Sequence, residues 1–248
     1  MSVLMRRAVA EFAGTAFLIM AVVGSGVMAS RLSPNDVGLQ LLQNSIATGA
    51  ALVALILALQ PVSASFNPVV TLVERALGIL DTRTALGLIA AQFAGGLAGT
   101  VIANLMFGLD AVTLSTHERA GTGLWLGEVI ATIGLVLIVF GTVRSGRAER
   151  VAFAVGGYIT AAYWFTSSTS FANPAVTVAR TITDTFAGIA PVSAPAFIIA
   201  QLLGGAAGFL LIRALYPSIP APALAAPALA APALAAPAVA APDRKVLS

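Results

Sequence analysis

Two short stretches of the chain carry residues that could act on a solute at membrane depth. Each places an asparagine directly before a proline, Asn67 before Pro68 and Asn173 before Pro174, between long apolar runs. Proline suits the first turn of a helix because its missing N–H needs no partner there, and the asparagine before it can cap that helix. A helix from Pro174 to about Asp184 would be roughly 15 Å long, half the apolar thickness of a bilayer. We therefore expect two half-length helices.

The chemistry expected where two such helices meet is selective solute passage. Two N-termini facing each other place two positive dipole ends at the membrane centre. The amide of Asn67 or Asn173 can cap backbone with its carbonyl and donate a hydrogen bond with its nitrogen. A neutral solute then finds donors on both sides, whereas a proton or cation meets an electrostatic barrier. Two ordinary capped surface helices are the alternative, and the matching placement of the two motifs argues against it.

The composition indicates a membrane protein. The 248 residues are 58% hydrophobic and 9% charged, whereas a soluble domain has about a quarter charged residues. The net charge of +3 comes from basic residues scattered at segment ends, which does not indicate nucleic-acid binding. With no cysteine and a single histidine, His117, neither a thiolate nor a multi-histidine metal site can form. We expect no metal, no cofactor and no enzymatic activity.

Six apolar stretches are long enough to cross a bilayer. They cover approximately residues 8–30, 39–60, 84–107, 122–143, 151–169 and 193–216. The Asn-Pro stretches lie between the second and third spans and between the fifth and sixth. With the N-terminus inside, ten basic residues lie inside and three outside, a bias that predicts a cytoplasmic location for both termini.

The two halves of the chain repeat each other. The segment Ala91–Gly99 matches Ala200–Gly208, with glycines spaced four apart for close helix packing, and Glu11 matches Glu128. Each half has an odd number of spans, so the second enters the membrane from the opposite side. An inverted repeat with broken helices usually places a solute path near the midplane.

The repeat defines the predicted domain organisation. Residues 1–216 are expected to form one channel domain, with repeats at about 8–107 and 122–216. Residues 217–248 are rich in proline and alanine, and prolines at a five-residue spacing preclude a regular helix. We interpret this segment as a flexible or polyproline-like cytoplasmic tail.

Over residues 8–216 the chain resembles the major intrinsic proteins, the aquaporins and aquaglyceroporins. The resemblance implies an all-α membrane protein with six tilted helices, two re-entrant half-helices, one pore per protomer and a homotetramer. The second motif, Asn173-Pro174-Ala175, has the family's usual form, whereas the first departs from it at Val69. This valine adds two methyl groups where the half-helices touch, and we expect altered packing rather than a lost pore.

A second departure concerns the outer constriction, which in most members of the family has an arginine directly after the second motif. Val176 takes that place here, and Arg180, one helical turn further along, is not expected to substitute for the arginine. By similarity, the other constriction residues are Thr48, Ser170 and a residue between Ala161 and Tyr163. None of these candidates is charged, so we expect a wide, neutral constriction.

A wide, neutral constriction favours small uncharged solutes such as glycerol, urea or undissociated arsenous acid. Among the branches of the family, the pattern looks most like bacterial channels associated with arsenic resistance, which implies a bacterial inner membrane. A general channel for water and small solutes, or a water-selective aquaporin, is the alternative.

Glu11 and Glu128 are ionisable residues inside predicted spans, so a proton relay has to be weighed. By resemblance, each accepts hydrogen bonds from the backbone of the neighbouring re-entrant loop, and Gln92 and Gln201 bond across helices. A coupled secondary transporter would need ion-binding groups near the midplane, and apart from these two glutamates we find none. A passive channel is therefore the favoured function.

Overall fold

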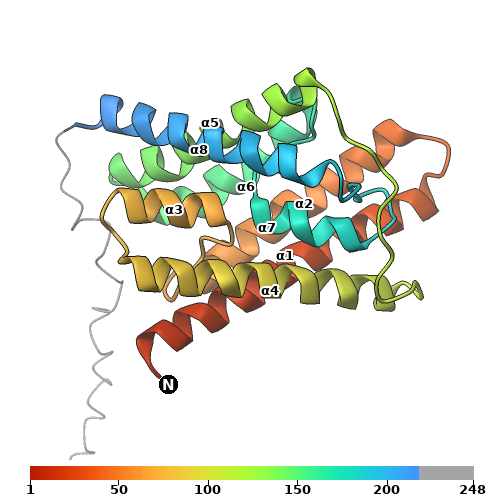
Figure 1. Ribbon diagram of the computed structural model, residues 1–248, viewed down its shortest axis with the longest axis horizontal. Coiled ribbons are helices and arrows are strands. Elements are labelled where there is room, and N and C mark those ends of the chain that lie inside the picture. The colour runs from red at the N-terminus through yellow and green to blue at the C-terminus, as the bar shows by residue number, and fades with distance from the viewer. Residues whose placement is uncertain (218–248) are drawn as a thin grey trace, which may run out of the picture.

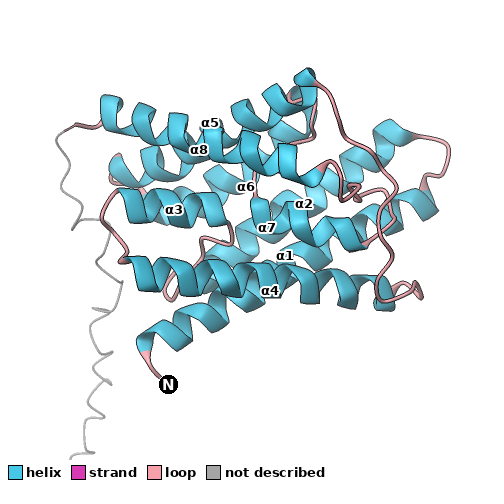
Figure 2. Ribbon diagram, viewed as in Figure 1, coloured by secondary structure: helices cyan, strands magenta, loops and turns pink. Residues whose placement is uncertain are grey.

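The computed structural model describes residues 1–217, and within that range it contains helices and loops and no strand (Figure 2). The long helices pack in pairs from different parts of the chain (Figure 1). The first pair is α1 (Val3–Leu32) with α4 (Thr82–Met106), and the second is α5 (Thr122–Arg144) with α8 (Ala194–Leu215). A third pair, α2 (Val37–Leu59) with α6 (Val151–Phe165), completes the bundle. The predicted tail lies outside the described residues, apart from residue 217.

Four short elements complete the described part of the chain. The half-helices are α3 (Pro68–Ala76) and α7 (Pro174–Ala179), and α7 continues into the 3-10 turn η2 (Arg180–Ile182). A second 3-10 turn, η1 (Ala148–Arg150), precedes α6. In Figure 1, α3 and α7 lie roughly end to end in the middle of the bundle.

Five of the described helices are long and apolar enough to cross a membrane: α1, α2, α4, α5 and α8. The remaining predicted span, 151–169, is wrong at its end, because α6 stops at Phe165 after 15 residues. Beyond it, the N–H of Thr169 donates to the carbonyl of Thr166 in a turn, and Thr169 has a positive φ of 61°. The chain thus leaves the helix early and turns back toward the start of α7.

Glycines allow two of the helix pairs to approach closely. A Cβ at Gly95 of α4 would overlap the backbone of Phe12 in α1, and one at Gly204 of α8 would overlap the backbone of Val129 in α5. Backbones in direct contact leave no room for a side chain at these positions. These contacts hold each long pair at the spacing that frames the two half-helices.

Candidate functional site

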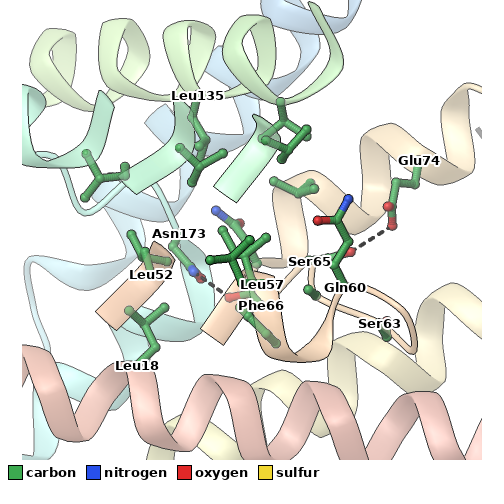
Figure 3. A pocket seen from close by; sticks show the side chains of 18 of the residues that line it. Leu18, Leu52, Leu57, Gln60, Ser63, Ser65, Phe66, Glu74, Leu135 and Asn173 are labelled. Carbon is green, nitrogen blue, oxygen red and sulfur yellow. Dashed lines mark hydrogen bonds between the residues drawn. The ribbon is translucent and has the colours of Figure 1, made fainter. Parts of the chain in front are cut away.

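The two asparagines bind each other's loops. The Nδ2 group of Asn67 donates to the carbonyl of Ala172 at 2.8 Å. The Nδ2 group of Asn173 donates to the carbonyl of Phe66 at 2.7 Å, a bond that Figure 3 shows. These reciprocal bonds hold the N-termini of α3 and α7 together. An amide nitrogen has two hydrogens, so each asparagine keeps a second donor after making this bond.

The side-chain carbonyl of each asparagine caps its own half-helix. Oδ1 of Asn67 accepts from the N–H of Val69 at 2.9 Å. Oδ1 of Asn173 accepts from the N–H of Ala175 at 3.0 Å and of Val176 at 3.2 Å. Both amides are therefore fixed in orientation by bonds on both ends, which is the arrangement that a preorganised donor site needs.

Glu11 anchors the loop before α3. One carboxylate oxygen accepts from the hydroxyl of Ser63 at 2.6 Å and from the N–H of Ser65 at 2.9 Å. The other accepts from the N–H of Phe66 at 2.7 Å and from the amide of Gln92 at 2.8 Å. The structure thus shows the bonds to loop backbone that the family resemblance implied for this glutamate.

Glu128 anchors the loop before α7 in the same way. Its two oxygens accept from the N–H groups of Phe171 and Ala172, both at 2.9 Å, and from the amide of Gln201 at 2.6 Å. Glu128 is fully buried, and its partners are two loop N–H groups, one amide and the nearby hydroxyl of Ser168. Both glutamates are therefore occupied as acceptors for structural donors.

These carboxylates hold an unfavourable backbone conformation. Phe66 and Ala172, each directly before its asparagine, have positive φ values of 47° and 48°. Residues other than glycine adopt this region at a cost of about 1–3 kcal/mol and need surrounding structure to hold them there. The bonds from both N–H groups to Glu11 or Glu128 supply that restraint and aim the asparagines.

A cavity of about 930 Å³ runs past the junction. Both asparagines line it, and Figure 3 shows Leu18, Leu52 and Leu135 around Asn173. Much of the wall is aliphatic, and uncharged polar groups gather along the loops before α3 and α7. The charged residues of the lining lie away from the junction and are Arg6, Arg7, Glu74, Glu149 and Arg180. Neither Glu11 nor Glu128 is among the described residues that line this cavity. A wall with few fixed donors is suited to small solutes that carry both polar and apolar surface.

Most of the predicted constriction residues meet at one end of the cavity. Thr48, Tyr163, Ser170 and Val176 all line it, and the hydroxyls of Thr48 and Tyr163 lie 3.2 Å apart. Ala161 is exposed and is not among the described residues that line it, so within the stretch from Ala161 to Tyr163 it is Tyr163 that lies at this end. The residues of α6 that face the cavity are spaced four apart, and Ala161 lies on another face of this helix. The cavity-facing residues are Val151, Val155, Ile159 and Tyr163.

A constriction without charged residues was expected at this end, but Arg180 lines the cavity there. The residue is 3% exposed and is one of the residues that line the cavity. Its guanidinium carbon lies 3.4 Å from the centroid of the Phe171 ring, and its Nε donates to the carbonyl of Ala187. Phe171 also lines the cavity and was missed. The i to i+4 spacing from Val176 was the sequence signal for Arg180, because residues four apart share a helical face.

Val69 packs against α8. A Cβ added at Gly205 would overlap a methyl group of Val69, so the glycine provides the space that the valine occupies. At the related contact in the other half, the nearest atoms to Gly96 are the Cβ of Ala179 at 3.1 Å and the carbonyl of Ala175 at 3.3 Å. The helix that accommodates the unusual residue is thus α8, which the sequence did not indicate.

Within residues 1–217, no group of histidine, cysteine, aspartate and glutamate side chains could hold a metal ion. His117 lies in the loop before α5, where its Nδ1 is 3.5 Å from Asp184. The N–H of Thr116 donates to Asp184 and lowers the pKa of that carboxyl below its ordinary value of 3.8. This cluster joins two loops at the Arg180 end and lies outside the cavity lining.

Comparisons with known proteins agree on one family. The model of the major intrinsic protein family matches residues 1–166 and 144–241. Aquaglyceroporin AqpS of Rhizobium meliloti (strain 1021) is 50% identical over 219 residues, which are 88% of this chain and 93% of that protein. The X-ray structure of the aquaglyceroporin from Plasmodium falciparum aligns with a TM-score of 0.63, covering 87% of this chain and 96% of that one. At 18% identity, this second likeness shows the fold alone.

Proposed function

We propose that this chain, which belongs to the major intrinsic protein family, is a passive transmembrane channel for small uncharged solutes such as glycerol. The observation that carries the proposal is the cavity of about 930 Å³ that passes two fixed asparagine amides. The 50% identity to a protein described as an aquaglyceroporin supports the same solute class. We further propose that water passes along the same path.

The electrostatics of the junction support exclusion of ions. The N-termini of α3 and α7 meet, so their positive dipole ends act on the same point of the cavity. A cation that leaves water at the junction finds no carboxylate there, because Glu11 and Glu128 lie outside the described lining, and the carboxylates that do line the cavity, Glu74 near the end of α3 and Glu149 in η1, lie away from the junction. The same absence speaks against a coupled transporter, which would need ion-binding groups near the midplane.

We propose that the range of solutes extends beyond glycerol to undissociated metalloid hydroxides such as arsenous acid. Val176 supports this breadth, because valine is smaller than the usual arginine and lines the cavity beside Thr48 and Tyr163. Arsenous acid and glycerol both carry three hydroxyl groups on a compact core, so one constriction can pass both. A channel that passes only water is the competing function.

Light scattering in a stopped-flow instrument tests the proposal directly. Proteoliposomes containing the wild type should pass water, glycerol and arsenous acid faster than empty liposomes do. Val176→Arg should lower glycerol flux about tenfold or more by filling the constriction, while water flux falls less. Val112→Arg, at a loop position that is 54% exposed, is the matched control and should leave every flux unchanged. Fast water without glycerol flux in the wild type would leave a water-selective channel.

We also propose the assembly and orientation that the family resemblance implied. The chain would assemble as a homotetramer with one pore per protomer in a bacterial inner membrane, with both termini in the cytoplasm. Residues 1–216 would form one channel domain of two inverted repeats, and the matched bonds of Glu11 and Glu128 support this symmetry. Native mass spectrometry of the detergent-solubilised protein tests the assembly, and protease access to residues 217–248 in oriented vesicles tests the orientation.

A further inference from the structure

We propose that Arg180 supplies the positive charge of the outer constriction, in place of the arginine missing at position 176, and with Ser170 forms a subsite for hydroxylated solutes. The inference rests on the proposed channel function. It deepens that function by naming the residues that select the solute at one end of the cavity.

The position of Arg180 follows from the geometry of α7. Val176 and Arg180 are four residues apart, so they lie on the same face of the half-helix. Both line the cavity, as do Phe171 and Ser170 from the preceding loop. The chain thus places a guanidinium one turn beyond the usual position and still exposes it to the solute path.

Two contacts keep the guanidinium at the wall. Its carbon lies 3.4 Å from the centroid of the Phe171 ring, a cation–π arrangement, and Nε donates to the carbonyl of Ala187. With the arginine held against Phe171, the space beside Val176 stays open. A constriction built this way combines a fixed charge with a wider passage than an arginine at position 176 would leave.

The charge of Arg180 is not paired directly with an acid. In the part of the chain that the structure describes, neither Arg180 nor Arg119 forms an ion pair, although the buried carboxylate of Glu128 acts on both of them electrostatically. Arg119 lies near the same ring, 5.1 Å from its centroid, but does not line the cavity. A buried cation usually has a paired carboxylate. Because Glu128 lies outside the lining and Arg180 is part of it, the charge nearest to the solute path is positive and opposes protons and cations.

Free hydrogen-bonding groups complete the subsite. The Nη groups of Arg180 have no hydrogen-bond partner among residues 1–217. The hydroxyl of Ser170 also lacks a partner in that range. The residue is buried, with 3% of its surface exposed, and lines the cavity. Buried polar groups rarely stay unpaired without a reason. Donors on the arginine and a donor-acceptor on the serine match a solute with several hydroxyl groups.

The experiment measures proton flux and glycerol flux separately in proteoliposomes, the first with a trapped pH-sensitive dye after a pH jump. Arg180→Gln keeps a side-chain donor and removes the charge, so proton flux should rise about tenfold or more with glycerol flux retained. Arg180→Lys keeps the charge and should exclude protons as the wild type does. Arg119→Gln is the matched control, since Arg119 contacts the same ring from outside the lining, and its proton flux should stay low.

The serine is tested by the ratio of glycerol to water flux. Ser170→Ala removes one hydrogen-bonding group and should lower that ratio about fivefold, with proton exclusion intact. An unchanged ratio would overturn the role of Ser170 in the subsite.

Three results would overturn the role of Arg180. They are low proton flux in Arg180→Gln, equal leaks in the lysine and glutamine variants, and an equal leak in Arg119→Gln. If Arg180→Gln does not reconstitute, Arg180→Met, which keeps the stem against Phe171, replaces it. Proton flux should rise in the same way, and glycerol flux should fall because methionine has no donor. A wild type without glycerol flux would reject the proposed function, whereas the proton measurements would still decide the role of Arg180.

Discussion

The two half-helices α3 and α7, with the loops that lead into them, are nearly identical at the junction and different at their far ends. Near the junction, each has an asparagine cap, a preceding residue with positive φ and a glutamate that accepts two loop N–H groups. Seven residues after the asparagine, or about two turns, α3 carries Glu74, bonded to Ser65 (Figure 3), whereas α7 leads to Arg180. Both of these charged residues line the cavity, at opposite ends of the pair of half-helices.

The shared part extends through a chain of side chains that links each carboxylate to its half-helix. The amide of Gln92 donates to Glu11 and to the hydroxyl of Thr71, and that hydroxyl donates to the carbonyl of Asn67. Glu128, Gln201, Thr177 and Asn173 form the same chain in the second half. Every member satisfies a buried polar group of its neighbour, so the arrangement tolerates little change.

The comparison separates two kinds of residue: those that bond to the loop backbone and support the fold, and those at the ends of the cavity that can select the solute. Residues that satisfy loop N–H and carbonyl groups are the same in both halves, because both loops present the same groups. In the described part of the chain, Glu74 and Arg180 form no hydrogen bonds with the loop of the other half, so the charge at each end of the cavity can differ. The scaffold carboxylates should therefore matter most for stability, and the cavity ends most for selectivity.

The largest effect is expected from removing a scaffold carboxylate. Glu11→Ala leaves four donors without their acceptor, and Glu128→Ala leaves three donors and the nearby hydroxyl of Ser168, and each buried unpaired donor costs about 1–3 kcal/mol. Both should lower the melting temperature of the detergent-solubilised protein by about 10 °C or more, and by similar amounts. Circular dichroism during heating measures this. Glu149→Ala, at a side chain that is 68% exposed, is the control and should change little.

A much larger fall in melting temperature for Glu128→Ala than for Glu11→Ala would break the expected similarity. It would mean that the loop before α7, with three residues of positive φ, depends more on its carboxylate than the number of bonds indicates. Thr169, Ser170 and Ala172 are those three residues.

A smaller effect is expected where the halves differ in packing. Gly205→Ala should destabilise the protein by about 1–3 kcal/mol, because the new methyl group overlaps Val69. Gly96→Ala should cost less, since its nearest contacts are looser, at 3.1 and 3.3 Å. Val69→Ala should rescue Gly205→Ala, and a double-mutant cycle of melting temperatures measures the coupling. A strictly additive double variant would show that the valine and the glycine do not share this space.

The smallest effect is expected from two exposed aspartates that hold the ends of the half-helix regions. The pKa of Asp184 is lowered by the N–H of Thr116, and the pKa of Asp81 by the hydroxyl and N–H of Thr84. A lowered folded pKa means that each stabilising contribution is complete above the ordinary value of 3.8. It is lost as the pH falls through the lower, folded value.

Asp184→Asn should therefore speed hydrogen exchange in residues 110–119 at pH 7, because Asp184 joins two loops. Asp81→Asn should change exchange only in the first turn of α4, which it caps. The difference between Asp184→Asn and the wild type should shrink as the pH falls below 3.8. A loop that exchanges at the same rate in both proteins at pH 7 would show that this contact does not hold it.

Much of the fold was readable from the sequence because the signals were local. Apolar length predicted the spans within a few residues, except for the end of α6 and the start of α1, which begins at Val3 and not at residue 8. Asparagine followed by proline predicted both half-helix starts, and the structure shows both asparagines as N-caps. The early end of α6 escaped prediction because the four hydroxyl residues 166–169 do not by themselves end a helix, while the contacts that hold this loop come from residues distant in sequence.

The constriction was only partly readable. Similarity to the family placed Thr48, Tyr163, Ser170 and Val176 at the constriction, and all four line the cavity. The expectation that no charged residue lies there was wrong, because Arg180 also lines it. A side chain as long as arginine can reach over a full turn, so its position in the sequence does not fix where its charge lies. Phe171 and Ala187 decide that, and no local pattern links them to Arg180.

The sequence by itself determined the membrane spans, the two capped half-helices and the duplicated glutamates, because apolar length, helix capping and repetition act over short distances. Only the tertiary structure decided which atoms those glutamates hold, why Val69 fits against α8, and where the guanidinium of Arg180 lies. Each of these depends on residues far apart in the chain whose contacts exist only after the halves have packed. The physical reason is the same in each case: buried polar groups and bulky side chains are placed by the partners that surround them.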